Sequence, residues 1–254
     1  MAQRRTALIT GVGRGAGIAA AVARQLADSH DLVLSGHPDY DGGTGAEGED
    51  EALALVEELR DGDARVSYLA ADLAEPAAPR QLVAAARESL GALDTLVAAH
   101  AHSRPTPLGS LDAAEIDHHL TVNVRATLLL VEAFANAHEH SHGQGRVILF
   151  SSGQRLGPMP AELAYAASKG ALEALVISLA TELAPAAIAV NALNPGPTDT
   201  GLLSGNTYEE IRARFPGGRW GTPEDAARTV AWLASDDAAW ISGQTLDAEG
   251  GFRR

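Results

Sequence analysis

The fold of this chain is decided by one stretch near its start, Thr10-Gly11-Val12-Gly13-Arg14-Gly15-Ala16-Gly17. The apolar segment before it, Thr6–Thr10, is typical of a buried strand, and the Ala-rich segment Gly17–Asp28 is typical of a helix. Glycine permits a tight turn and lets backbone N–H groups approach a phosphate closely. A glycine turn at a strand-to-helix junction therefore predicts a site for the pyrophosphate of a dinucleotide. A tight turn without a ligand is the alternative.

Short apolar strands and longer helices alternate along the rest of the chain. Further strands are expected at Asp31–Ser35, Arg65–Ala70, Thr95–Ala99, Arg146–Phe150, Ile188–Leu193 and Gln244–Leu246. Helices are expected at Glu51–Arg60, Ala77–Leu90, Ala113–Ala137 (which could be broken), Glu162–Leu183 and Pro223–Ala234. Because strands separated by helices pair in parallel through right-handed crossovers, we expect an α/β fold. It would be a single doubly wound parallel sheet of seven strands with helices on both faces, forming one domain over residues 1–254.

The composition excludes several classes of site and partner. The chain has no Cys, which rules out disulfides, Cys-ligated zinc, iron–sulfur clusters and thiol nucleophiles. The net charge of −14 argues against nucleic acid or an anionic membrane as a partner. No apolar run approaches the ~20 residues of a membrane helix, and Gly11–Gly17 interrupt the apolar start too early for a signal peptide. We therefore expect a cytoplasmic protein.

The end of the second strand bears on the choice between NAD and NADP. An acidic side chain there would accept hydrogen bonds from the ribose 2′-OH and repel a 2′-phosphate. The residues present are Ser35, Gly36 and His37, with no acid before Asp39, and Arg14 could pair with a 2′-phosphate. These features favour NADP(H), although Arg14 could equally be a solvated loop residue. The acidic loop Asp39–Asp50 would favour NAD(H) if it folds over the adenosine.

Tyr165 and Lys169 lie four residues apart in a helical run and therefore on one helix face. Lys169 is the single lysine of a chain that otherwise uses arginine, which indicates a position where an ammonium is required. A neighbouring ammonium favours the phenolate, so Tyr165 could exchange a proton with an alcohol or carbonyl oxygen. A plain surface pair and a Schiff-base lysine are the alternatives.

Two further polar residues could complete such a site. Ser152 follows the strand Arg146–Phe150, at the end of the sheet where ligands bind, and its hydroxyl could bind a substrate oxygen. Ser151 is its immediate competitor. Asn123 lies in a helical segment, where its amide could hold a water that links Lys169 to solvent or could simply be a satisfied core group.

These motifs resemble those of the short-chain dehydrogenase/reductase family over essentially the whole chain. The Gly-x3-Gly-x-Gly spacing matches the glycine turn of that family. Its catalytic tetrad is matched in order and spacing, which selects Ser152 over Ser151, by Asn123, Ser152, Tyr165 and Lys169. Later landmarks of the family are matched by Asn194–Thr200, Gly218–Asp225 and Ile241–Gln244. The pattern is similar to that of the 3-oxoacyl-carrier-protein reductases.

The resemblance implies a nicotinamide cofactor and an oligomeric protein. Asp72 would accept a hydrogen bond from the adenine amino group, and Lys169 would donate one to the nicotinamide ribose. The cofactor contacts expected in full are Gly11, Gly13, Arg14, Gly15, Ala16, Gly17, Gly36, His37, Asp72, Leu73, Ala99, Tyr165, Lys169, Pro195, Gly196, Thr198 and Thr200. The family pattern also implies a homotetramer or a homodimer.

One segment departs from the family. After the fourth strand the family usually has Asn-Asn-Ala-Gly, where this chain has Ala98-Ala99-His100-Ala101. In the family the amide ties neighbouring strands together and the glycine lets the cofactor ribose approach. The departure puts cofactor affinity and local sheet stability in doubt, and leaves open whether His100 and His102 face a ligand or only fill space.

We expect an NAD(P)(H)-dependent oxidoreductase that interconverts a carbonyl and a secondary alcohol of a small molecule, with Tyr165 as general acid/base. The substrate would contact His102, Gln154 and Met159 beneath a lid at about residues 198–215. The alternatives are a non-catalytic dinucleotide sensor and a lyase similar to the halohydrin dehalogenases, which carry Arg in place of the Lys. No metal site is expected, and His138, His140 and His142 are most simply part of a solvated loop. His118 and His119 need no function.

Overall fold

Residues 4–37, 48–139 and 143–254 are described by the computed structural model of the chain. The strands are β1 (Arg5–Thr10), β2 (His30–Gly36), β3 (Val66–Ala70), β4 (Thr95–Ala98), β5 (Gly145–Phe150), β6 (Ile188–Asn194) and β7 (Thr245–Asp247). The α-helices are α1 (Ile18–Leu26), α2 (Gly48–Arg60), α3 (Ala78–Leu90), α4 (Ala113–His119), α5 (Ala126–Ala137), α6 (Leu163–Leu183), α7 (Gly205–Arg212) and α8 (Pro223–Ala234).

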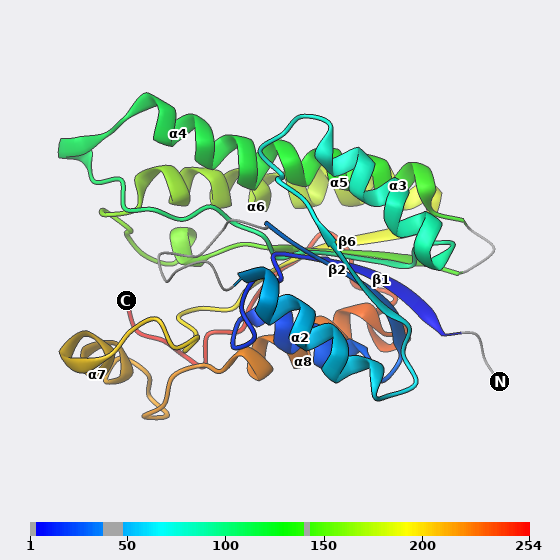
Figure 1. Cartoon of the computed structure of the whole chain (residues 1–254). Coiled ribbons are helices and arrows are strands. Elements are labelled where there is room, and N and C mark those ends of the chain that lie inside the picture. Colours follow the sequence, from blue (N-terminus) through cyan, green and yellow to red (C-terminus); the bar gives the residue numbers. More distant parts are fainter. Residues whose placement is uncertain (1–3, 38–47, 140–142) are drawn as a thin grey trace.

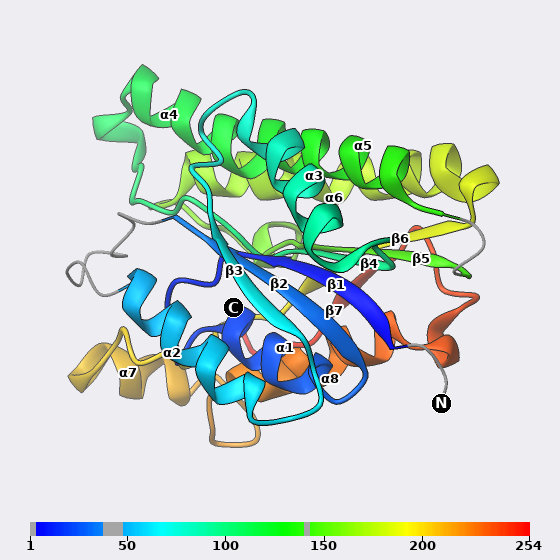
Figure 2. The same cartoon turned by 45° about the vertical axis from the view of Figure 1, so that its right-hand side comes forward.

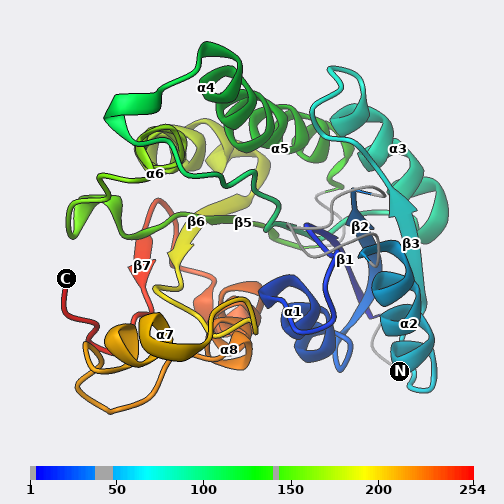
Figure 3. The same cartoon turned by 60° about the vertical axis from the view of Figure 1, so that its left-hand side comes forward.

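The strands form one sheet of seven, in the order β3-β2-β1-β4-β5-β6-β7, and every neighbouring pair is parallel. Figure 1 shows the sheet between two layers of helices, with α3, α4, α5 and α6 on one side and α1, α2 and α8 on the other. The predicted doubly wound α/β fold is therefore confirmed. The same two layers are visible along the sheet in Figure 3.

The core is divided by the sheet because successive side chains of a strand point to opposite faces. On β1, Ala7 and Ile9 pack with the residues of α1, α2 and α8, whereas Leu8 packs with those of α3, α5 and α6. All three side chains are fully buried. Burial on both faces explains why the strands read as near-continuous apolar runs in the sequence.

The order of the strands creates a switch point between β1 and β4. From β1 the chain winds outward through β2 to β3, and it then returns across the sheet to β4 on the other side of β1 (Figure 2). Ligands of open α/β folds bind in the crevice at the carboxyl ends of strands at such a point. The segments that leave β1 and β4 there begin at Gly11 and Ala99.

Several local differences separate the structure from the predicted elements. The segment Ala113–Ala137 is two α-helices joined by π-helical residues Leu120–Arg125, rather than one regular helix. Strand β7 begins one residue later than predicted. Helix α7 was not predicted, and it lies within the segment expected to be a lid. Its residues are largely exposed and carry no apolar face that would mark a helix in the sequence.

Within the described residues, one helix is long and apolar enough to cross a membrane by length and composition, Leu163–Ala186. This is α6 with the short turn that follows it. Leu172 and Val176 of this helix are buried, and α6 packs against β6. Part of the apolar surface of α6 is thus buried against the sheet.

Candidate active site

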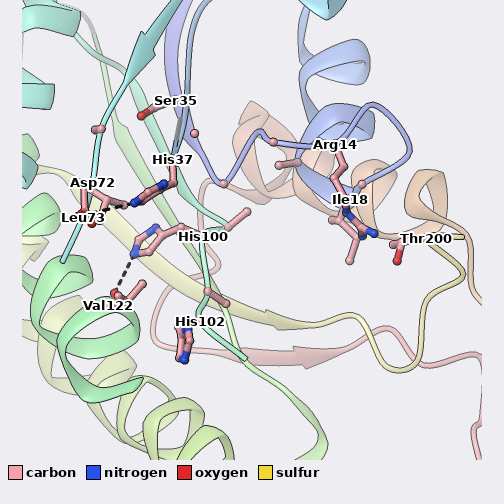
Figure 4. A pocket seen from close by; sticks show the side chains of 18 of the residues that line it. Arg14, Ile18, Ser35, His37, Asp72, Leu73, His100, His102, Val122 and Thr200 are labelled. Atoms are coloured by element: carbon pink, nitrogen blue, oxygen red, sulfur yellow. Dashed lines mark hydrogen bonds and ion pairs between the residues drawn. The ribbon is translucent and has the colours of Figure 1, made fainter. Parts of the chain in front are cut away.

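A cavity of about 340 Å³ lies at the switch point, between the ends of β1, β2, β3 and β4 (Figure 4). Its lining includes predicted cofactor and substrate residues from several separate segments, namely Gly11, Gly13, Arg14, Gly17, Gly36, His37, Asp72, Leu73, Ala99, Thr200 and His102. The other residues that line it include Ser35, His100, Ala101, His118 and Val122. The fold therefore brings together, in one cavity, residues that are up to 189 positions apart in the sequence (11 to 200).

The glycine turn is shaped by two close backbone approaches. Gly11 has a φ of +82°, and a Cβ there would lie 2.6 Å from the backbone nitrogen of His100. A Cβ at Gly36 would overlap the carbonyl oxygen of Val12. By contrast, a Cβ at Gly13 would meet no atom within 4 Å. The turn is thus packed tightly against β2 and β4 and leaves open space above Gly13, which suits a ligand lying along the backbone.

Charged groups of both signs lie at this turn. The N–H of Gly15 donates a 2.5 Å hydrogen bond to Oε2 of Glu51, near the start of α2. Figure 4 shows Arg14 extending from the turn on the side of Ile18 and Thr200, across the cavity from His37 and Asp72. In this conformation the guanidinium is therefore not beside the end of β2, where a 2′-phosphate partner was expected.

Asp72 and His37 face each other on the opposite side of the cavity (Figure 4). His37 Nε2 lies 3.7 Å from Asp72 Oδ2, and Asp72 Oδ1 accepts a 2.8 Å hydrogen bond from the N–H of Ala74. The second contact is a local turn two residues long rather than a cap of α3, which begins at Ala78. Asp72 thus presents a carboxylate to the cavity from a fixed backbone.

His100 takes over the tie between strands that the family's asparagine provides. Its Nδ1 lies 2.7 Å from the hydroxyl of Thr10 at the end of β1, and its Nε2 lies 3.2 Å from the carbonyl oxygen of Val122. Burial, and secondly the charge of Lys169, lowers the pKa of His100 from 6.5 to about 3, so the ring stays neutral. The departure Ala98–Ala101 therefore keeps a buried polar connection between β1, β4 and the π-helical segment.

Lys169 connects α6 to the end of β5. Its Nζ donates a 2.9 Å hydrogen bond to the carbonyl oxygen of Phe150 and lies 5.6 Å from the centre of the Tyr165 ring. The side chain is almost completely buried, and burial lowers the pKa of the ammonium from 10.5 to about 8. The predicted Tyr–Lys pair thus lies on one face of α6, next to the strand that leads to Ser152.

The two serines after β5 have different surroundings. Ser151 is 3% exposed and accepts a 3.1 Å hydrogen bond from Nε2 of Gln154. Ser152 is half-buried, and in the described part of the chain no group forms a hydrogen bond with its hydroxyl. The hydroxyl available to a ligand is therefore that of Ser152. Gln154, expected to contact substrate, donates from Nε2 to Ser151 and to Glu173, whose Oε2 is 2.5 Å away.

Asn123 lies in the π-helical segment and is fully buried. Its Oδ1 accepts from the N–H of His102 at 2.7 Å, and its Nδ2 donates to the carbonyl oxygen of His102 and to the hydroxyl of Ser168, both at 2.9 Å. The side chain therefore has its hydrogen bonds supplied by protein. A water held by this amide, one of the two predicted readings, is not supported by the geometry.

A second polar network lies where the loops after β5 and β6 meet. The buried carboxylate of Glu249 accepts a 2.8 Å hydrogen bond from Asn194 Nδ2 and pairs with Arg254. Asn194 Oδ1 in turn accepts from the N–H of Gly196. A Cβ at Gly153 would overlap the Arg254 guanidinium, so this side chain lies directly against the residue after Ser152. This network could not be predicted from the sequence, because Arg254 and Gly153 are 101 positions apart.

Other predicted residues lie outside the lining of the cavity. They are Gly15, Ala16, Asn123, Ser152, Gln154, Met159, Tyr165, Lys169, Pro195, Gly196 and Thr198. His138, expected in a solvated loop, is instead buried, with Nδ1 3.1 Å from the carbonyl oxygen of Leu93 and its ring stacked on Phe134. His140, His142 and most of the acidic loop Asp39–Asp50 lie outside the described residues.

The comparisons with known proteins agree with this arrangement. The model of the family described as enoyl-(acyl carrier protein) reductase matches residues 11–253. The uncharacterized oxidoreductase YjdA of Bacillus subtilis (strain 168) is 40% identical over 253 residues, covering 99% of this chain and 98% of the relative. The short-chain dehydrogenase/reductase eriH of Hericium erinaceus is 33% identical over 262 residues, covering 99% of this chain and 98% of the relative.

The chain belongs to the short-chain dehydrogenase/reductase family. It is thus a member of a family of oxidoreductases. Among the solved structures similar to this family member, a short-chain dehydrogenase from Burkholderia cenocepacia J2315 in complex with NADP has a TM-score of 0.85 and 32% identity. The matched region covers 97% of each of the two chains.

The cavity of this short-chain dehydrogenase/reductase has features that fit a dinucleotide. A Cβ at Gly13 would meet no protein atom within 4 Å, so open space lies above the turn there, and Gly11 and Gly36 line the same cavity without side chains. The carboxylate of Asp72 offers an acceptor at one end, and Thr200 lies at the other end (Figure 4).

Proposed function

We propose that this protein is an NAD(P)(H)-dependent oxidoreductase that interconverts a carbonyl and a secondary alcohol of a small molecule. The observation that carries the proposal is the position of Lys169. Its ammonium lies 5.6 Å from the centre of the Tyr165 ring and donates to Phe150 at the end of β5, and its charge acts on His100, which lines the cavity. The dinucleotide would lie along the residues Gly11, Gly13, Gly17, Gly36, Asp72 and Ala99. When bound, it supplies or accepts the hydride.

The protein's own groups would handle the proton and orient the carbonyl. Lys169 stabilises negative charge on the Tyr165 oxygen, which therefore can release its proton to a developing alkoxide. Ser152 donates its hydroxyl hydrogen to the carbonyl oxygen and fixes its direction. In the oxidative direction the same groups act in reverse, with Tyr165 accepting the proton of the alcohol.

Asn123 would act through the backbone in this scheme. Because its amide holds both the N–H and the carbonyl of His102, and also Ser168 next to Lys169, it fixes the segment after β4 against α6. Asn123 is thus a positioning residue.

We further propose a preference for NADP(H), with Arg14 as the partner of the 2′-phosphate. The support is that Arg14 lines the cavity and that no acid is present at the end of β2. Two observations oppose it: Arg14 extends away from His37, and the Glu51 carboxylate lies at the turn. If Arg14 binds the 2′-phosphate, Arg14→Ala should weaken NADPH binding at least tenfold and leave NADH binding unchanged. An equal effect on both dinucleotides would contradict the assignment.

We also propose that residues 1–254 form one domain, with residues 198–215 closing over the substrate and Met159 on its wall. A homotetramer or homodimer, which the resemblance implies, and a cytoplasmic location, which follows from the composition, belong to the same proposal. The alternatives of a dinucleotide sensor and of a lyase are less well supported, because Ser152, Tyr165 and Lys169 lie on adjoining elements of the structure.

The test of the proposed function is Tyr165→Phe. This variant removes one hydroxyl and keeps the ring, so it should bind dinucleotide within about threefold of the native protein. Because proton transfer by a positioned side chain contributes ~10²–10⁴-fold, turnover of any ketone found in a broad screen should fall by at least two orders of magnitude. Unchanged turnover would remove Tyr165 from the mechanism.

A further inference from the structure

His102 lies in the cavity wall with its backbone fixed on both sides. It follows β4, and the amide of Asn123 binds its N–H at 2.7 Å and its carbonyl oxygen at 2.9 Å. The residue is 7% exposed, and that small exposed surface belongs to the cavity lining. The backbone of His102 is thus held in place by contacts that do not involve its ring.

The ring itself is oriented by a carboxylate on α4. His102 Nε2 lies 2.5 Å from Oε1 of Glu115. The rings of His118 and His119 meet the His102 ring edge-on, with centroids 4.3 and 4.5 Å away. Hydrogen bonding to His102 holds the pKa of Glu115 below its usual value, so the carboxylate is ionised and can only accept. The Nε2 atom must therefore carry the hydrogen of this bond.

The other ring nitrogen then has a lone pair and faces no protein donor. Burial lowers the pKa of His102, which makes the neutral ring the dominant form at neutral pH. A neutral imidazole with its hydrogen on Nε2 has an acceptor at Nδ1. Among residues 4–37, 48–139 and 143–254, no group donates to this atom, and it is not one of the buried polar atoms left without a partner. Nδ1 therefore keeps some exposed surface, on a residue that lines the cavity.

We propose that His102 Nδ1 is a hydrogen-bond acceptor for a hydroxyl group of the ligand, with Glu115 fixing the tautomer that makes it one. The inference rests on the proposed function, because a dinucleotide and a carbonyl or alcohol substrate are the ligands it assigns to this cavity. Two ligand groups could donate this hydrogen bond. One is a ribose hydroxyl of the dinucleotide, and the other is a substrate hydroxyl next to the reacting carbon. Glu115 is a positioning residue in either case.

A metal ion is the competing occupant of this cluster. The ligand atoms of His102, Glu115 and His119 all lie within 4.8 Å of one another. However, His119 Nε2 accepts a hydrogen bond from the N–H of Arg104, and Nδ1 lies 2.8 Å from the carbonyl oxygen of Glu115. The hydrogen of this ring is therefore on Nδ1, the atom a metal would need. The present hydrogen bonds favour the acceptor role over metal binding.

The experiment compares His102→Leu, which removes the acceptor, with His102→Asn, which can place an amide oxygen near the position of Nδ1. The dissociation constants of NADPH and NADH are measured by nicotinamide fluorescence. The discrimination of kcat/KM between acetoin and butan-2-one, which differ by one hydroxyl, is measured in parallel. Asp117→Asn is the matched control, because Asp117 is an exposed carboxylate on the same helix. Circular dichroism checks that each variant is folded.

We expect at least a tenfold change in one readout for His102→Leu, partial recovery in His102→Asn and no change in Asp117→Asn. A weaker dinucleotide affinity identifies the ribose as the source, and lost discrimination identifies the substrate. Unchanged values in both readouts overturn the inference, as does retention of Zn²⁺ by the native protein that is lost in Glu115→Gln. A native protein that binds neither dinucleotide would instead contradict the proposed function.

Discussion

Arg254 pairs with the buried carboxylate of Glu249 and in doing so lies against Gly153, the residue after Ser152. Glu249 also accepts a hydrogen bond from Asn194 at the end of β6. The two loops that would carry the substrate-binding serine and the nicotinamide end of the cofactor are thus joined by one ion pair. Removal of one partner of a buried ion pair leaves the other charge buried and uncompensated, which destabilises the folded protein.

Arg254→Gln should therefore destabilise the protein. Removal of one partner of a buried ion pair costs ~3–5 kcal/mol, and because the Arg254 side chain is 17% exposed we expect the lower end of that range. The free energy of unfolding is measured with urea. Arg253→Gln is the control, since Arg253 is exposed, and should stay within ~0.5 kcal/mol of the native value. Equal effects of the two substitutions would contradict the assigned role of the pair.

Alanine at two glycines of the turn should separate stability from binding. Gly11→Ala forces a Cβ against the backbone of His100 at a φ of +82°, so we expect a loss of more than ~1 kcal/mol in the free energy of unfolding. Gly13→Ala meets no protein atom and should leave the stability unchanged, but its methyl group enters the space assigned to the dinucleotide. Urea unfolding and nicotinamide fluorescence measure the two effects. A Gly13→Ala variant that binds dinucleotide normally would contradict that placement.

Acid should destabilise the protein through two buried histidines. Burial lowers the pKa of His100 to about 3 and that of His30 to about 4, against an unfolded value near 6.5. Between these values the unfolded chain binds protons that the folded chain does not, so their contribution to stability is complete above pH ~6.5 and is lost as the pH falls toward 3–4. The free energy of unfolding should decrease steadily over this window.

The contribution of His100 to this acid response can be isolated. His100→Asn keeps a buried hydrogen-bonding group near Thr10 but removes the titrating ring. Urea unfolding at several pH values should give a shallower decrease for this variant than for the native protein. An identical slope would show that His100 is already protonated in the folded state near pH 6.

Lys169 should set an alkaline limit on turnover. Because burial lowers its pKa to about 8, the ammonium that stabilises the Tyr165 oxygen is lost as the pH rises through that value. We expect kcat/KM to fall above pH ~8. Lys169→Arg keeps the positive charge at all these pH values, so the kcat/KM of this variant should not fall above pH ~8. The same fall in both proteins would assign it to another group.

The parts of the fold that could be predicted are those that depend on local pattern. Strands such as β1 are buried on both faces and therefore appear as short apolar runs, and the turn after β1 needs glycine at Gly11 for steric reasons. Helix α7 could not be predicted because it buries none of its residues. The π-helical residues Leu120–Arg125 include Asn123, whose contacts with the distant residues His102 and Ser168 cannot be seen in the sequence.

The polar contacts of the site were harder to predict than its residue types. The bond between His100 and Thr10 joins positions 90 apart, and the Glu115–His102 bond depends on where α4 is placed over the sheet. Gln154 carries a side chain suited to substrate binding, yet the fold places Glu173 within reach of its amide. Residue type indicates what a side chain can do, and the packing of distant elements decides which partner it finds.

Dinucleotide binding in the cavity is tested by titrating the purified protein with NADPH and with NADH while following nicotinamide fluorescence. We expect saturable binding of at least one dinucleotide, tighter for NADPH, and loss of that binding in Gly13→Ala. Absence of binding for both dinucleotides would contradict the assignment of the cavity and, with it, the proposed oxidoreductase mechanism.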